Sequence, residues 1–123
     1  MARDLKPSIV DTPQSRFDDL AHRVFTQYSE GRQRAALELL AQPDPDLEPW
    51  SAELAHSTAC LHGSLDEPAA ALRVLRTASE AGAWWDPSIL IDDDDLAALR
   101  SVPEFQELVA LSATRRSPDQ RPR

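Results

Sequence analysis

Apolar residues recur every three or four positions along most of the chain, which is the spacing of one face of a helix. The runs predict four helices, over residues 13–30, 32–41, 49–65 and 68–81. Thr12 before Pro13 is typical of a helix start, because threonine can cap the first turn and proline fits its first position. Gly31 and Gly82 are typical of helix ends. No stretch alternates apolar and polar residues convincingly, so the predicted fold class is all-α.

The last third of the chain predicts shorter elements. Trp84 and Trp85 open an aromatic turn, and residues 92–100 follow as four aspartates and then a short helical stretch. Ser101 ahead of Pro103 predicts the start of a final helix. Its core-facing residues are expected to be Phe105, Leu108, Val109 and Leu111. We expect Trp84 to pack in the core and Trp85 to stay partly exposed.

An internal repeat relates the second and fourth predicted helices. RAALELL, residues 34–40, and AAALRVL, residues 69–75, share a pattern in which Ala36 aligns with Ala71, an offset of 35 residues. A small residue at that position allows two helices to approach closely. Helical hairpins that repeat about every 34 residues are typical of tetratricopeptide repeats (TPR).

Two longer segments resemble known helical arrays. The segment ACLHGSLDEPAAALRVLRTASEAG, residues 59–82, is similar to the last repeat of bacterial TPR arrays. The continuation WWDPSILIDDDDLAALRSVPEFQELV, residues 84–109, is similar to the stretch that closes such arrays. This resemblance to TPR proteins implies a TPR-like helical hairpin array, with two hairpins plus short C-terminal closing helices. It also implies a protein-interaction scaffold that carries out no catalysis.

The ends of the chain differ from its middle. Residues 1–12 are predicted to be a flexible lead-in, because Pro7 and Pro13 discourage regular structure there. Residues 115–123 carry four arginines against one aspartate and no apolar residue except proline, which predicts a disordered basic tail. The TPR-like α-helical domain is expected to span residues 13–114.

Composition narrows the function. Thirteen Lys and Arg against 21 Asp and Glu give a net charge of −8, which excludes a typical nucleic-acid binder because phosphate contacts need basic residues. Cys60 is the only cysteine, so an intramolecular disulfide is impossible and a reducing compartment is favoured. No apolar segment has the length of a membrane span or the form of an export signal. We therefore expect a cytoplasmic protein without a membrane partner.

Three features could carry chemistry. His56 and Cys60 lie four positions apart, hence on one helix face, but His62 points elsewhere and two ligands make a poor zinc site. Cys60 falls in mid-helix, where no backbone N–H is available for an oxyanion hole. The run Asp92–Asp95 lacks the glycine and the distal glutamate of a calcium loop and is expected to be a solvated capping turn. The sequence therefore predicts no enzyme, no metal and no cofactor.

The predicted function is a protein–protein interaction module that binds a peptide or protein segment in an acidic concave groove. The partner should be basic or of mixed charge, and self-association into a homo-oligomer is compatible with the short array. The groove residues implied by the TPR resemblance are Ala21, Phe25, Tyr28, Glu53, His56 and Cys60. A rival interpretation places Phe25 and Tyr28 in a core stripe that begins at Phe17. Two other functions stay open: a small acidic inhibitor or immunity-type protein that masks a basic site, and a metal-dependent enzyme that uses His56, Cys60 and Asp92–Asp95.

Overall fold

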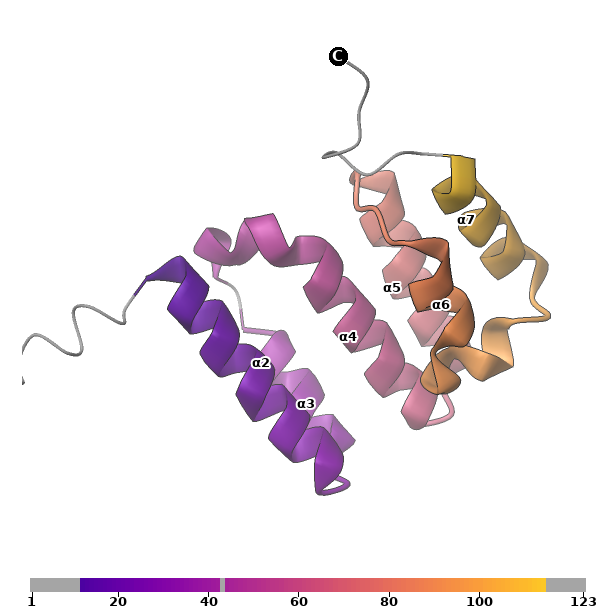
Figure 1. Ribbon diagram of the computed structural model, residues 1–123. Coiled ribbons are helices and arrows are strands. Elements are labelled where there is room, and N and C mark those ends of the chain that lie inside the picture. The colour runs from indigo at the N-terminus through magenta and orange to yellow at the C-terminus, as the bar shows by residue number, and fades with distance from the viewer. Residues whose placement is uncertain (1–11, 43, 115–123) are drawn as a thin grey trace, which may run out of the picture. The chain divides into compact units, whose positions relative to one another are not determined.

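The fold is described from a computed structural model, in which residues 12–42 and 44–114 are defined (Figure 1). The helices, with 3-10 helices labelled η, are α2 (Pro13–Ser29), α3 (Gln33–Leu40), η2 (Pro45–Trp50), α4 (Ser51–Ser64), α5 (Pro68–Glu80), α6 (Pro87–Asp92), η3 (Asp94–Leu99) and α7 (Pro103–Thr114). No strand occurs among these residues, which confirms the all-α prediction. The defined residues separate into two compact units. The boundary between them in the sequence lies between Trp50 and Ser51, and each unit is described by itself.

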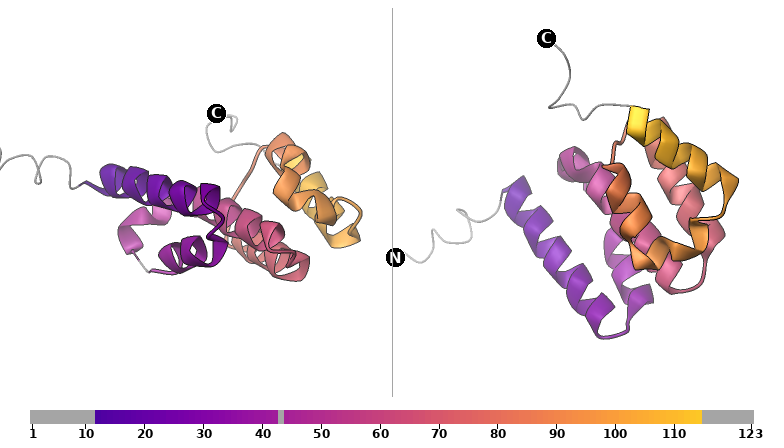
Figure 2. Two further views of the ribbon diagram at one scale, coloured as in Figure 1. Left: turned by 90° about the horizontal axis from the view of Figure 1, so that it is seen from below. Right: turned by 45° about the vertical axis from the view of Figure 1, so that its right-hand side comes forward.

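The first unit is a helical hairpin of α2 and α3 followed by η2 (Figure 2). Thr12 caps α2 as predicted, because its side-chain oxygen accepts a hydrogen bond from the backbone N–H of Ser15 at 3.1 Å. Gly31 turns the chain between the helices with a φ of 78°, a left-handed conformation that glycine adopts without strain. Phe17 stacks on Trp50 with ring centroids 5.0 Å apart, so η2 packs against the start of α2.

The second unit is built on the pair α4 and α5. Ala59 of α4 and Ala71 of α5 are both fully buried in its core, where small side chains permit close helix packing. Ala36 in the first unit is fully buried as well, so the prediction that both aligned alanines are core residues is confirmed. The helix that was expected from residue 49 begins instead with the 3-10 turns of η2, and α4 starts at Ser51.

The C-terminal elements α6, η3 and α7 complete the core of the second unit. Leu90, Leu96 and Phe105 are almost completely buried there, together with Leu75 of α5. Helix α6 was not predicted; it starts where Asp86 accepts a hydrogen bond from the backbone N–H of Ser88 at 2.9 Å.

Four details of this region correct the sequence-based expectations. Trp85, not Trp84, is the core tryptophan: it is 4 % exposed, and its indole N–H donates to the Ala52 carbonyl oxygen at 2.8 Å. Trp84 is half-buried. Leu111 is 43 % exposed because it lies on the outer side of α7. Helix α7 begins at Pro103, so its first intrahelical acceptor is the carbonyl of Val102 rather than that of Ser101.

Three predictions concern parts of the chain or properties that the fold does not decide. Residues 1–11 of the expected lead-in and the expected tail, 115–123, lie outside the defined residues. Within the defined part, every helix is too short or too polar to cross a bilayer. The cytoplasmic location stays a prediction.

Candidate functional site

Three side chains that can bind metals converge in the second unit. His56 and Cys60 come from α4, and Asp93 comes from the residue that precedes η3. The Cys60 Sγ lies 3.5 Å from the His56 Nε2 and 3.0 Å from the Asp93 Oδ2, and these last two atoms are 3.3 Å apart. All three residues are half-buried. The sequence had predicted no metal and had combined His56 and Cys60 with the run Asp92–Asp95 only in the metal-dependent-enzyme alternative; of that run, the structure places Asp93 against the pair.

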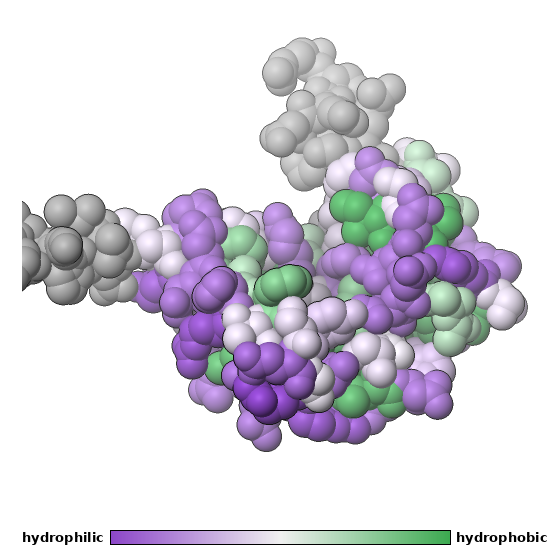
Figure 3. Space-filling view, turned by 60° about the horizontal axis from the view of Figure 1, so that its bottom comes forward, coloured by the Kyte–Doolittle hydropathy of each residue, from purple (hydrophilic) through white to green (hydrophobic). Residues whose placement is uncertain are grey.

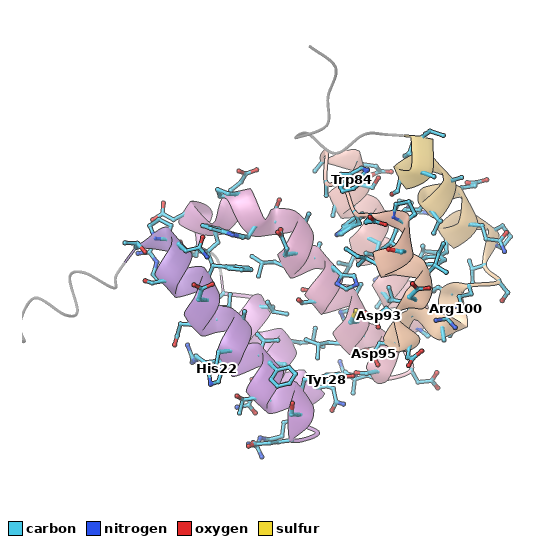
Figure 4. The ribbon with its side chains drawn as sticks, in the orientation of Figure 1. His22, Tyr28, Trp84, Asp93, Asp95 and Arg100 are labelled. Atoms are coloured by element: carbon cyan, nitrogen blue, oxygen red, sulfur yellow. The ribbon has the colours of Figure 1, made fainter. Side chains whose placement is uncertain are left out.

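The local sequence explains how these residues meet. Positions 56 and 60 are one helical turn apart, so both side chains leave the same face of α4. Asp93 caps η3: its Oδ1 accepts a hydrogen bond from the backbone N–H of Asp95 at 2.9 Å, which leaves Oδ2 directed at α4 (Figure 4). Arg100 holds the segment in place, because its Nε donates to the carbonyl oxygen of Ile91 at 2.8 Å.

Gly63 permits the close contact between α4 and η3. A Cβ atom at this position would overlap the carbonyl oxygen of Asp95 and would lie 2.9 Å from its carbonyl carbon. Only a residue without a side chain allows the backbone of η3 to approach the helix this closely. The absence of a side chain at Gly63 therefore helps to bring Asp93 within reach of Cys60.

The electrostatic surroundings keep Cys60 protonated. Burial is the main cause that raises the pKa of its thiol far above the usual range, and the hydrogen bond to Asp93 and the charges of Asp93 and Asp95 raise it further. A thiol reacts as a nucleophile only in its ionised form. Cys60 is therefore a hydrogen-bond donor to Asp93 rather than an activated nucleophile.

The predicted partner-binding residues fall on both units. Ala21 and Phe25 are exposed on α2, Phe25 to 65 %, and Tyr28 is half-buried there. The rival interpretation placed Phe25 and Tyr28 in the core; it is wrong for Phe25, whereas the half-buried Tyr28 does not decide it. Glu53 is exposed on α4, which also carries His56 and Cys60. The three residues of the first unit lie on α2, and the three residues of the second unit lie on α4. A groove lined by all six residues stays a prediction.

Other surface features were not found from the sequence. Three large apolar side chains are exposed on the contacting helices α6 and α7, namely Ile89, Ile91 and Leu111. On the face that Figure 3 presents, apolar surface is interrupted by hydrophilic residues. A shallow groove between α2 and α3 is lined by polar and apolar surface, with His22, Arg23 and Glu38 among its residues.

The fold and the site together define a small helical domain with one protonated thiol beside a histidine and a carboxylate. A family model described as A/B hydrolase-like, N-terminal domain, matches residues 16–120, which is most of the chain. The chain therefore belongs to this family. No curated protein and no solved structure matches it.

This family assignment corrects the TPR resemblance. The resemblance rested on an offset of 35 residues that aligns Ala36 with Ala71 and on the segments 59–82 and 84–109; the two alanines are indeed buried at helix contacts. A small residue at a helix contact is required wherever two helices pack closely, so the pattern describes helix pairs in general rather than one repeat family. The all-α fold class was right and the family was wrong.

Proposed function

We propose that this chain is a non-catalytic helical domain that binds an α/β-hydrolase-like catalytic domain, in the same polypeptide or as a separate protein. The observation that carries the proposal is the match of residues 16–120 to a family named for the N-terminal domain of α/β-hydrolase-like proteins. A domain of that name is expected to act together with the hydrolase-like part. This proposal keeps the expected interaction function and gives the partner a chemical class.

The absence of hydrolase machinery from the sequence supports an accessory role. The α/β-hydrolase nucleophile sits in a G-x-S-x-G turn between a strand and a helix. The chain has three glycines, Gly31, Gly63 and Gly82, and none of them belongs to such a motif. The defined residues also contain no strand on which the turn could be built.

The exposed apolar side chains of α6 and α7 support a docking role for the second unit. Ile89, Ile91 and Leu111 are each more than 40 % exposed on two helices that contact each other. Burying such side chains against a partner would contribute roughly 25 cal/mol per Å² of apolar surface. The net charge of −8 favours a basic or mixed rim around the partner's surface and faster association at low salt.

A direct binding assay tests the proposal. The purified chain is mixed with the α/β-hydrolase-like domain encoded downstream in the same gene or in an adjacent gene, and complex formation is measured by light scattering and calorimetry. We expect a stable one-to-one complex. No binding between the two purified proteins at micromolar concentration would refute the proposal.

Two sets of variants locate the surface. The double variant Ile91→Asp with Leu111→Asp places charges on α6 and α7, and Phe25→Asp is the matched control, because Phe25 is an exposed apolar residue of the other unit. We expect the double variant to weaken binding at least about tenfold, since charges at a buried contact remain uncompensated. If only Phe25→Asp weakens binding, the interface includes α2, which carries three of the six groove residues expected from the sequence.

A further inference from the structure

The site formed by His56, Cys60 and Asp93 offers three different ligand atoms to one point in space. An imidazole nitrogen, a thiol sulfur and a carboxylate oxygen all lie within 4.8 Å of one another, and they come from two separate elements of the second unit. These three ligand types are the ones that bind Zn²⁺ in proteins. The inference from these three side chains does not depend on the hydrolase-like partner proposed above.

The dimensions of the triangle fit a tetrahedral zinc ion. Ligands at the usual Zn–N, Zn–O and Zn–S distances of about 2.0–2.3 Å are separated from each other by roughly 3.3–3.6 Å. The measured separations are 3.5 Å from the Cys60 Sγ to the His56 Nε2 and 3.3 Å from that nitrogen to the Asp93 Oδ2. The remaining separation, from Sγ to Oδ2, is 3.0 Å, because a thiol hydrogen bond joins these two atoms. An opening of about half an ångström along this edge would accommodate the ion.

The position of the ion follows from the same distances. The point in the plane of the three ligand atoms that is equally far from each lies about 1.9 Å from them, so a metal at normal bond lengths would sit slightly out of this plane. That displacement is typical of a tetrahedral ion with three protein ligands and a fourth position open to water. Among the defined residues, no fourth His, Cys, Asp or Glu joins the group.

The charges also fit a divalent ion. A neutral imidazole, a thiolate and a carboxylate carry a total charge that balances Zn²⁺, and the negative charge of Asp95 nearby adds to the attraction. On binding, the Sγ–H bond breaks, the proton leaves to solvent and an Sγ–Zn bond forms. The nitrogen and sulfur ligands favour Zn²⁺ over Mg²⁺ and Ca²⁺, which prefer oxygen ligands alone.

We propose that His56, Cys60 and Asp93 form a Zn²⁺ site that fastens η3 to α4. Asp93 can serve both roles at once, because its Oδ1 caps η3 while its Oδ2 faces α4. A bound ion therefore replaces the hydrogen bond from Cys60 without removing the cap. It would join two parts of the second unit that lie 33 residues apart in the sequence.

Cobalt spectroscopy of the full chain is the decisive test. The reduced, tag-free protein is stripped with a chelator and titrated with Co²⁺, which takes the place of zinc and absorbs visible light when it is tetrahedral. We expect a thiolate-to-cobalt charge-transfer band that saturates at one equivalent and disappears when Zn²⁺ is added. Cys60 is the only cysteine in the chain, so the band can arise only from this site. A wild-type protein without this band overturns the proposal.

Matched variants test the individual ligands. His56→Ala and Asp93→Asn should each weaken Zn²⁺ binding at least about 100-fold in competition with a chromophoric chelator, because a direct ligand should matter at least as much as an outer-shell residue. Asparagine retains a side-chain oxygen that can cap η3, so Asp93→Asn is expected to fold. The controls are the other two histidines: His22 is exposed on α2, and the His62 Nδ1 lies 2.8 Å from the Glu67 Oε1 without a thiol nearby. Equal losses in His22→Ala or His62→Ala, or no loss in His56→Ala and Asp93→Asn, would overturn the assignment.

Discussion

Replacing Gly63 by alanine would raise the helix propensity of α4 but would disturb its packing against η3. Alanine is more favourable than glycine in a helix interior by about 0.8–1.0 kcal/mol, and because Gly63 is the next-to-last residue of α4, an isolated α4 would gain at most this much. In the folded unit, however, the new Cβ would overlap the carbonyl oxygen of Asp95 and approach the Leu96 Cδ2 to 3.7 Å. The backbone of η3 cannot rotate away as a flexible side chain can, so η3 has to move from α4.

The expected change follows from the two opposing contributions. Overpacking of this kind costs about 1–3 kcal/mol, and displacement of η3 also loosens the packing of Leu96, which is fully buried. After subtraction of the gain in helix propensity, overpacking leaves about 0–2 kcal/mol, and the loosened packing of Leu96 adds to this, so we expect Gly63→Ala to lower the free energy of unfolding by about 1–3 kcal/mol. For a unit of this size that corresponds to a melting temperature lower by roughly 4–24 °C.

Urea unfolding followed by circular dichroism and tryptophan fluorescence measures this change. Glu53→Ala is the control, because Glu53 is exposed on the same helix and its replacement should change stability by less than about 0.5 kcal/mol. If Gly63→Ala is as stable as the wild type or more stable, η3 does not contact α4 as described. The same variant should also bind zinc more weakly, since Asp93 would move with η3.

Three further predictions concern the second unit. Ala71→Arg should abolish the cooperative thermal transition, because Ala71 is fully buried and an arginine there has neither space nor a counter-charge; an unchanged melting curve would contradict the packing of α4 on α5. Trp85→Phe should cost about 1–3 kcal/mol in urea unfolding, since the Ala52 carbonyl loses its donor and some packing is lost. Burial raises the pKa of the Cys60 thiol, so the thiol ionises more readily in the unfolded chain, and stability should fall as the pH rises above about 8.5. A Cys60→Ser variant should lose less stability over that range, and equal loss in both proteins would contradict the assigned cause.

The helices that local chemistry specifies could be predicted from the sequence. Thr12 and Pro13 begin α2, and Gly31 forms the turn between α2 and α3 with a positive φ. Such residues can be recognised from the sequence, because they determine the backbone conformation at their own positions. The buried alanines at 36 and 71 were also predictable, since a regular apolar period marks the face that must be packed. What that pattern could not supply was the family, because any tight pair of helices needs the same small residues.

The predictions failed where orientation depends on a short connection. Trp84 and Trp85 are adjacent, so the path of the turn before α6 decides which of them enters the core, and the apolar period does not record that path. Helix α6 has only six residues, which is too short for a helical period to be recognised. Leu111 fits the apolar spacing of α7 but lies on its outer side, because no element of the defined chain covers it.

The candidate metal site shows the same division between local and distant information. The spacing of four residues placed His56 and Cys60 on one helix face, but the sequence did not predict a metal there. It could not show which residue of Asp92–Asp95 would reach the pair, because Asp93 lies 33 positions beyond Cys60 and meets it only through the packing of η3 on α4. One signal of that packing was present in the sequence. Gly63 is the next-to-last residue of α4, and a glycine there leaves room for another backbone to come close. Gly63, three positions after Cys60, therefore marks the point at which the backbone of η3 comes close to α4.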